Sequence, residues 1–155
     1  MTRGQAAVKR TLDLSVAVIG LALAGGLIVV TASIARLETG ASGIFRHHRV
    51  GRHGRIFTIY KVRTMQPAGG TTVTRHGDPR ISRSGRIFRK LKLDELPQLI
   101  NILRGDMSLV GPRPDVPGYA DRLAGAERLL LSVRPGITGP ATLKYRHEED
   151  LLAAQ

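Results

Sequence analysis

The stretch Leu93–Pro114, LDELPQLINILRGDMSLVGPRP, places two adjacent carboxylates at the start of an apolar run. Apolar residues recur in this run at i, i+3, i+4 and i+7, which predicts the buried stripe of a helix that ends near Gly105. The stripe consists of Leu96, Leu99, Ile100 and Leu103. A short helix with acids at its entrance is therefore the expected centre of the fold.

The two acids, Asp94 and Glu95, have a structural interpretation. Asp94 fits the N-cap of the predicted helix, and Glu95 fits its first turn, where a carboxylate interacts favourably with the helix dipole. Pro97 is tolerated there because first-turn N–H groups have no partner inside the helix. Capping alone would explain the pair.

The same acids also have a chemical interpretation. Adjacent helical residues point about 100° apart, so the two carboxylates would take separate tasks. Arg89, Lys90 and Lys92 are expected to keep Asp94 ionised and to attract a phosphate. One carboxylate could attack phosphorus while the other helps to hold Mg²⁺, a cation that prefers oxygen ligands.

The composition favours an anionic partner. The chain has 155 residues, enough for one compact domain, and a formal net charge of +12. Aromatic residues make up only 4% and Trp is absent, which weakens the case for single-stranded nucleic acid. Cysteine is absent too, which excludes disulfides, thiolate metal sites and a cysteine nucleophile.

An uncharged segment, Leu14–Ala35, has about the length that crosses the core of a bilayer. A secretory signal peptide is one alternative, because Lys9 and Arg10 form a basic start, but the apolar run is long for that class. A buried core helix is another, and it fits poorly because no polar face interrupts the run. The segment predicts membrane association.

Basic residues flank this segment on both sides. Arg3, Lys9 and Arg10 precede it. The arginines that follow are Arg36, Arg46, Arg49, Arg52 and Arg55. Since basic flanks favour the cytoplasm, both ends are expected on the cytoplasmic side of the membrane.

The pair Gly25-Gly26 lies near the middle of the segment and allows a sharp bend. A re-entrant helix that enters, bends and leaves on the same side satisfies both the bend and the flanking charge. The alternative is that the glycines, with Ala22 and Ala24, form a close-packing face for another helix.

The remaining chain has no internal repeat or clear linker. The predicted fold class is mainly α with little β: a membrane helix over residues 1–36 and a small cytoplasmic catalytic domain over residues 37–155. Arg55–Val62 has the composition of a strand, and Gln66–Arg80 that of a mobile loop.

A short basic amphipathic helix is expected just before the acids. Ile87, Phe88 and Leu91 would share one of its faces, opposite basic residues. The basic residues are Arg86, Arg89 and Lys90. Such a helix suits an interface with anionic phospholipid, although it could also be the solvated face of a soluble domain.

Several ordered blocks together resemble the bacterial sugar transferase family, the small monotopic phosphoglycosyl transferases. The blocks are KRTLDL, FRHHRVGRHGRIFTIYKVRTM, DPRISRSGRIFRKLKLDELPQLINILRGDMSLVGPRP and RPGITG. They extend from Lys9 to Gly139, so the resemblance covers most of the chain.

The resemblance implies an activity and residue roles. Family members transfer a sugar phosphate from a UDP-sugar to undecaprenyl phosphate, with release of UMP, in the assembly of exopolysaccharide, O-antigen or glycoconjugates. Asp94 would be the nucleophile that carries a covalent phosphosugar, and Glu95, with Asp94, would bind Mg²⁺. The implied phosphate and nucleotide contacts are Lys61, Arg63, Arg89 and Arg113.

The chain departs from the family pattern in three places. Gly25-Gly26 stands where members commonly have Ser-Pro, which leaves the bend without proline's forced loss of a hydrogen bond. His47-His48 replaces a more usual polar pair, and without a third ligand these histidines are not expected to bind metal. The sequence stops at Gln155, short of an aromatic stretch, which suggests truncation.

Two other classes of protein remain as alternatives. A basic nucleic-acid-binding module would explain the charge but not the uncharged segment, and it should bind with a steep salt dependence. A membrane anchor that recruits partners would explain the segment and the charge but not the acids beside an arginine cluster. The resemblance favours the enzyme, with no nucleic-acid partner.

Overall fold

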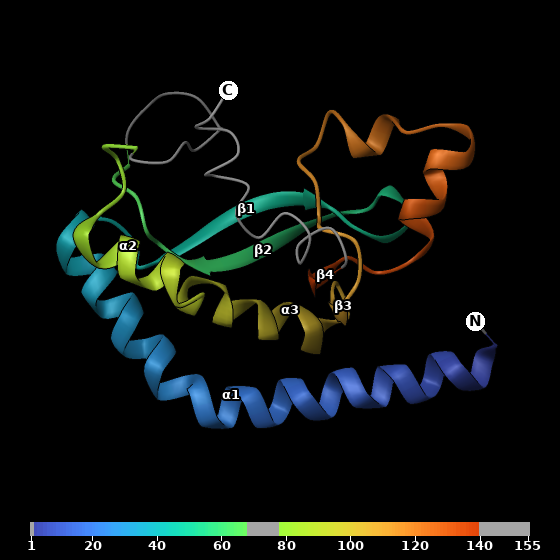
Figure 1. Ribbon diagram of the computed structural model, residues 1–155, viewed down its shortest axis with the longest axis horizontal. Helices are drawn as coiled ribbons and strands as arrows, with labels where there is room; N and C mark the ends of the chain where they lie inside the picture. The colour runs from blue at the N-terminus through green and yellow to red at the C-terminus, as the bar shows by residue number, and fades with distance from the viewer. Residues whose placement is uncertain (1, 68–77, 140–155) are drawn as a thin grey trace.

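The structure is a computed structural model that describes residues 2–67 and 78–139 (Figure 1). Over these ranges the chain is mostly helical, with two small two-stranded sheets. The elements are α1 (Arg3–Thr39), β1 (Ile44–Val50), η1 (Arg52–Gly54), β2 (Ile56–Val62), α2 (Arg83–Lys90), η2 (Leu93–Gln98), α3 (Leu99–Arg104), β3 (Ser108–Val110), η3 (Ala120–Arg122), η4 (Gly125–Ser132) and β4 (Gly136–Thr138), where η marks a 3₁₀ helix.

The long helix α1 contains the uncharged segment and continues three residues beyond the predicted boundary at residue 36, to Thr39. Thr2 and Gln5 form a capping box at its start, and Gly40 ends it with a left-handed φ of 66°. Figure 1 shows that the helix bends in its middle. By length and composition it could cross a membrane.

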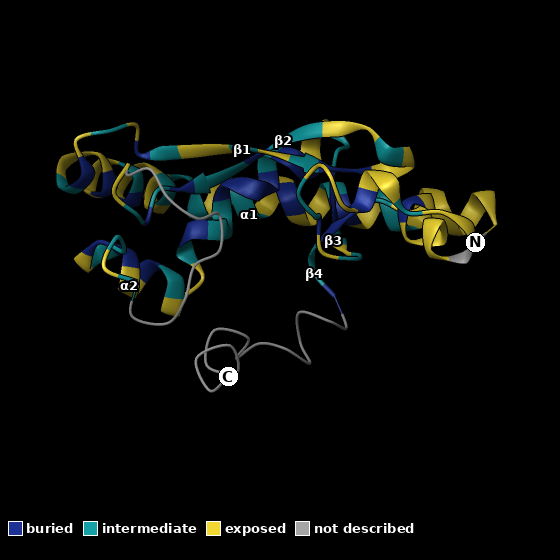
Figure 2. Ribbon diagram, turned by 90° about the horizontal axis from the view of Figure 1, so that it is seen from above, coloured by how far each residue is buried: buried dark blue, intermediate teal, exposed yellow. Residues whose placement is uncertain are grey.

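Packing on α1 reverses the usual pattern of a surface helix, because its buried residues are small or polar and its large apolar residues are exposed. The buried ones are Asp13, Ala17, Thr31, Ala35 and Thr39. By contrast, Leu23 is 81% exposed and Leu37 is 86% exposed. Figure 2 shows the buried part of α1 where it passes beneath the strands. A narrow stripe of small residues therefore lets α1 lie close to the rest of the chain, while its apolar side faces outward.

The strands β1 and β2 form an antiparallel hairpin with a register from Ile44 opposite Val62 to Val50 opposite Ile56. The predicted strand Arg55–Val62 is confirmed as β2, whereas β1 was not predicted. Asn101, which is fully buried on α3, binds the free edge of β2: its Oδ1 accepts from the Tyr60 N–H at 3.2 Å, and its Nδ2 donates to the Thr58 carbonyl at 2.7 Å. This amide holds α3 against the hairpin.

The strands β3 and β4 are parallel and bring the SLVGPRP and RPGITG blocks together. Gly111 and Gly136 make the approach possible, since a Cβ at Gly111 would lie 2.4 Å from the Arg134 carbonyl oxygen and one at Gly136 would lie 2.2 Å from the Gly111 nitrogen. Only glycine fits at either position.

The predicted helix after the acids is present, but its phase differs from the prediction. It begins as the 3₁₀ helix η2 and continues as α3, which ends at Gly105 with a φ of 90°, as expected. Leu99 is buried as predicted, but Leu103 is exposed and Ile102 is fully buried instead. A 3₁₀ helix has three residues per turn rather than 3.6, so the buried face shifts along the sequence.

The expected N-cap at Asp94 was wrong. Asp94 lies inside η2, and Lys92 occupies the N-cap position with a left-handed φ of 56° and no capping side-chain hydrogen bond. The side chain of Asp94 is therefore not used to start this helix.

The expected apolar face of α2 was also wrong in part. Phe88 is buried with Ala35 and Val62, whereas Ile87 is 57% exposed and Leu91 is 60% exposed. Ser82 caps the helix through its hydroxyl, which accepts from the Gly85 N–H at 3.0 Å. The predicted mobile loop, residues 66–80, lies for the most part outside the described residues.

Candidate active site

Asp94 is a buried carboxylate, 7% exposed, in the connection between α2 and α3. Its Oδ1 atom is buried and accepts no hydrogen bond from the residues that the structure describes. Burial raises the pKa of Asp94, and the charge of Glu95 acts in the same direction, while Lys61, Arg89 and Lys92 oppose the shift. Arg89 and Lys92 act in the direction that the sequence predicted, but the loss of solvent around Asp94 outweighs them and the net pKa is raised.

Glu95 is in a contrasting environment although it is the next residue. The Lys61 ammonium on β2 lies 3.0 Å from Glu95 Oε1 and donates a hydrogen bond to it. Burial alone would raise the pKa of Glu95, but Lys61, with smaller contributions from Lys92 and Arg113, lowers it. Glu95 is thus held as a paired anion, as the separate-task interpretation of the acids requires.

Three of the four predicted phosphate-binding cations act on the acid pair. Lys61 binds Glu95, the charge of half-buried Arg89 on α2 acts on Asp94, and the charge of exposed Arg113 acts on Glu95. These side chains come from β2, α2 and the segment after β3, so the site is assembled from separate parts of the chain.

Arg63 is held elsewhere by its own contacts. Its Nε donates to the Ser42 carbonyl at 2.6 Å, and its guanidinium lies 5.5 Å from the centre of the Phe45 ring. These contacts fix the base of the hairpin, where β1 begins. A role for Arg63 in phosphate binding stays a prediction.

The acid pair fits a magnesium ion only if the substrate supplies further ligands. Among the described residues there is no group of three or more His, Cys, Asp or Glu side chains that could hold a metal. Mg²⁺ is commonly bound by one or two carboxylates together with substrate phosphates and water. Within residues 2–67 and 78–139 the buried Oδ1 of Asp94 accepts no hydrogen bond, and the pKa of Glu95 is lowered, so both carboxyl groups could contribute to such a site.

Comparisons with known proteins identify the family of the chain. A profile described as "Bacterial sugar transferase" matches residues 4–154. The chain belongs to the bacterial sugar transferase family. The resemblance carried by the sequence blocks is thereby confirmed.

Three curated relatives show which transferases the chain is similar to. "Uncharacterized sugar transferase EpsL" of Bacillus subtilis is 40% identical over 140 residues, covering 90% of this chain and 69% of the relative. The UDP-N-acetylgalactosamine-undecaprenyl-phosphate N-acetylgalactosaminephosphotransferase of Aeromonas hydrophila is 38% identical, covering 92% of this chain and 35% of the relative. The UDP-glucose:undecaprenyl-phosphate glucose-1-phosphate transferase of Caulobacter vibrioides is 40% identical, covering 88% and 53%.

Two residues whose charges interact with the predicted cations were not predicted: His47 interacts with Lys61, and Arg49 with Arg113. His47 and Arg49 on β1 lie opposite Ile59 and Phe57, and they share the face of the hairpin that carries Lys61. Burial lowers the pKa of His47, and the charges of Arg49, His48 and Lys61 lower it further. Alternation along β1 would have placed both on this face had the strand been predicted.

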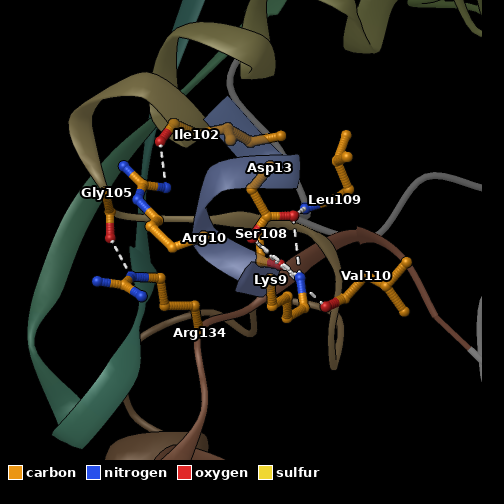
Figure 3. A network of polar contacts seen from close by, with 9 residues as sticks. All are labelled: Lys9, Arg10, Asp13, Ile102, Gly105, Ser108, Leu109, Val110 and Arg134. Atoms are coloured by element: carbon orange, nitrogen blue, oxygen red, sulfur yellow. Dashed lines mark hydrogen bonds and ion pairs between the residues drawn. The ribbon is translucent and has the colours of Figure 1, made fainter. Parts of the chain in front are cut away.

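A second polar network was not predicted at all. Lys9 and Asp13 on α1 meet Ser108 and Leu109 of β3, as Figure 3 shows. Nothing in the local pattern of KRTLDL indicates that Asp13 is buried. This network joins α1 to the segment that carries Arg113.

Proposed function

We propose that this bacterial sugar transferase moves a sugar 1-phosphate from a UDP-sugar to undecaprenyl phosphate and releases UMP. The product would initiate the assembly of an exopolysaccharide, O-antigen or glycoconjugate. Family membership supports the class of reaction, and relatives named as undecaprenyl-phosphate sugar phosphotransferases support the acceptor. The outward apolar side of α1 suits an enzyme whose acceptor is a membrane lipid.

The observation that carries the mechanism is the buried Oδ1 atom of Asp94 beside Lys61, Arg89 and Lys92. In the first step this oxygen attacks the phosphorus attached to the sugar. A bond forms between Asp94 and phosphorus, the bond from that phosphorus to the bridging oxygen breaks, and UMP leaves with the electron pair. In the second step a phosphate oxygen of undecaprenyl phosphate attacks the same phosphorus and releases the Asp94 carboxylate.

The surrounding cations would lower the barrier to both steps. A carboxylate that approaches a diphosphate meets like charge, and Lys61, Arg89 and Arg113 supply opposite charge from three directions. Burial of Asp94 strengthens its interactions with Lys61 and Arg89, because little water is present there to screen them. Lys61 also orients Glu95 through its hydrogen bond.

Asp94 and Glu95 would hold Mg²⁺ together with the donor diphosphate. When bound, the ion would neutralise charge on the phosphoryl oxygens. A chelator is therefore expected to abolish UMP release, and added Mg²⁺ to restore it. Full activity in excess chelator would remove the metal from the proposal.

We further propose that α1 is re-entrant and that the catalytic residues lie on the cytoplasmic face of the inner membrane. Basic residues flank both ends of the apolar segment, and α1 bends in its middle (Figure 1). A Cβ at Gly25 or at Gly26 would meet no atom within 4 Å, so neither glycine is needed for close packing within the described chain. This favours bending over packing as their role.

The test of the mechanism replaces Asp94 by Asn in the membrane-embedded protein and follows UMP release from a panel of UDP-sugars. Asp94→Asn keeps the size of the side chain and removes the nucleophile, so turnover should fall by orders of magnitude while the fold survives. The unchanged protein, incubated with labelled UDP-sugar and no acceptor, should retain a phosphosugar on a peptide that contains Asp94. Near-normal turnover of Asp94→Asn would refute the covalent step, and an adduct on Glu95 would reverse the two roles.

A further inference from the structure

The Asp13 carboxylate is the least expected buried charge on α1. It is 4% exposed, and both of its oxygens lie 2.9 Å from the Lys9 ammonium one turn earlier. The same oxygens reach β3: Oδ2 accepts from the Ser108 hydroxyl at 2.8 Å, and Oδ1 accepts from the Leu109 N–H at 3.1 Å. Lys9 also donates to the Ser108 hydroxyl. The start of β3 is thus fixed directly to the membrane helix (Figure 3).

The segment that follows β3 is rigid up to Arg113. The Gly111 N–H donates to the Thr138 carbonyl at 3.0 Å, and the Pro112 carbonyl accepts from the Gly136 N–H at 2.9 Å. The backbones approach so closely at Gly111 and Gly136 that a shift in the register of β3 and β4 would bring a side chain into contact with backbone atoms. A displacement at Ser108 would therefore be carried along the segment rather than absorbed within it.

The far side of Arg113 is fixed to the hairpin. The Arg49 guanidinium donates to the Pro114 carbonyl at 3.4 Å, and the Val50 N–H donates to the Asp115 carbonyl at 2.9 Å. Arg113 is exposed between these two anchored sections, and its charge acts on Glu95. Its place relative to the acid pair depends on where α1 holds β3.

We infer that Asp13 is a positioning residue for Arg113: α1 fixes β3 through Asp13 and Ser108 and thereby sets the distance from the Arg113 guanidinium to the donor diphosphate. This inference rests on the proposed function, because it takes Arg113 as a contact to that diphosphate. Asp13 itself touches no reacting atom.

Arg10 provides a matched comparison on the same turn of α1. Its guanidinium donates to the carbonyls of Ile102, at 2.8 Å, and Leu103, at 3.3 Å, at the end of α3. Both residues tie α1 to the rest of the chain with charged hydrogen bonds, but only Asp13 reaches β3. A general loosening of α1 should follow from either substitution, whereas a specific effect on Arg113 should follow only from Asp13.

The experiment is a double-mutant cycle on the affinity for UDP, the part of the donor that Arg113 would contact. The full chain in detergent is titrated with UDP and Mg²⁺ by calorimetry, as the unchanged protein, the single variants Asp13→Asn, Ser108→Ala, Arg10→Met and Arg113→Ala, and the three double variants with Arg113→Ala. Arg113→Ala should weaken UDP binding about tenfold or more, the usual effect of losing one charged hydrogen bond. Asp13→Asn and Ser108→Ala should weaken it in the same direction, but neither should weaken it further once Arg113 is absent.

Three results would overturn the inference. They are additive effects of Asp13→Asn and Arg113→Ala, unchanged UDP affinity in both Asp13→Asn and Ser108→Ala, and coupling of Arg10→Met to Arg113→Ala as strong as that of Asp13. Ser108→Ala leaves the ion pair of Lys9 and Asp13 in place, so the cycle can be completed even if Asp13→Asn folds poorly. UMP release by the unchanged protein is measured separately, so that failure of the proposed reaction is distinguished from failure of this coupling.

Discussion

Both halves of α1 pack on the rest of the chain, but their polar contacts differ. The N-terminal half packs through Ala17 and adds charged contacts: Asp13 binds β3 from a buried position, and Arg10 binds the end of α3. The C-terminal half uses a cap and packing: Glu38 accepts hydrogen bonds from the first N–H groups of α2, and Ala35 packs on Phe88. Between them lies Gly25-Gly26, where a Cβ at either position would meet no atom of the described chain within 4 Å.

This difference places each half beside a different part of the site. The N-terminal half contacts the segment that ends in Arg113, whereas the C-terminal half contacts α2, which carries Arg89. A helix that is anchored at both ends and free in the middle can bend without disturbing either contact. The arrangement predicts that the anchors are sensitive to substitution and that the bend is tolerant.

The largest loss of stability is expected from the buried anchor. Asp13→Ala removes the acceptor of the Ser108 hydroxyl and of the Leu109 N–H and leaves Lys9 without its partner. The free energy of unfolding should fall on the order of 2–4 kcal/mol, below the full cost of breaking a buried pair because Lys9 can reach solvent. Thermal unfolding in detergent would measure this, with Leu12→Ala on the same turn, 59% exposed, as the control. Equal melting temperatures for the two variants would mean that the contacts of Asp13 do not contribute to stability.

A smaller loss is expected where α1 packs on α3. A Cβ at Gly20 would lie 3.0 Å from Leu99 Cδ1, so Gly20→Val must displace a core side chain. Overpacking of this kind typically costs about 1–3 kcal/mol. Gly26→Val introduces the same side chain where a Cβ meets no atom within 4 Å, and it should leave the melting temperature nearly unchanged. A larger loss from Gly26→Val would show that the bend, not the packed face, is the sensitive part.

The cap at the C-terminal half should contribute less than the buried anchor. Glu38 Oε1 accepts from the Arg83 N–H at 2.7 Å, and Oε2 accepts from the Ser84 N–H at 3.1 Å and from the Ser84 hydroxyl. Glu38→Ala should cost about 0.5–2 kcal/mol, the range for loss of a capping acceptor, and Glu38→Gln should cost less. Unfolding experiments in detergent can rank these two against Asp13→Ala. A larger loss of stability from Glu38→Ala than from Asp13→Ala would mean that the C-terminal half of α1 is the more strongly anchored one.

The sequence predicted those parts of the fold that local patterns encode. Uncharged length identified α1, β-branched and aromatic residues identified β2, and Gly105 identified the end of α3. The strand β1 was missed because FRHHRV is mostly polar, and its pairing partner rather than its composition makes it a strand. The phase of the helix after the acids was missed because a 3₁₀ start changes the period.

The sequence indicated which residues are candidates for the site, but not how far each is buried or which charges lie beside it. Asp94 and Glu95 stand out in the sequence, and the cations around them came from local charge and from family blocks. The pKa shifts of the two acids are opposite because Asp94 is buried while Lys61 on β2 pairs with Glu95. Both effects arise from contacts between segments that are distant in the sequence. The burial of Asp13 has the same origin, since it follows from the position of β3.

A stabilising effect, with the largest consequence for topology, is expected at the bend. Replacing both Gly25 and Gly26 by Ala should stabilise the helix by about 0.5–1 kcal/mol at each position and stiffen it.

The chain has no cysteine, so single probes at Thr2→Cys and Ser42→Cys, on either side of the apolar segment, report its topology directly. In intact cells both should resist a membrane-impermeant thiol reagent when the glycines are present, because a re-entrant α1 keeps both ends inside. In the double-alanine background the Thr2→Cys probe should become partly labelled, because a straighter helix is long enough to cross the bilayer. Labelling of Thr2→Cys with the glycines intact would instead show that α1 spans the membrane and that its bend does not return the chain to the same side.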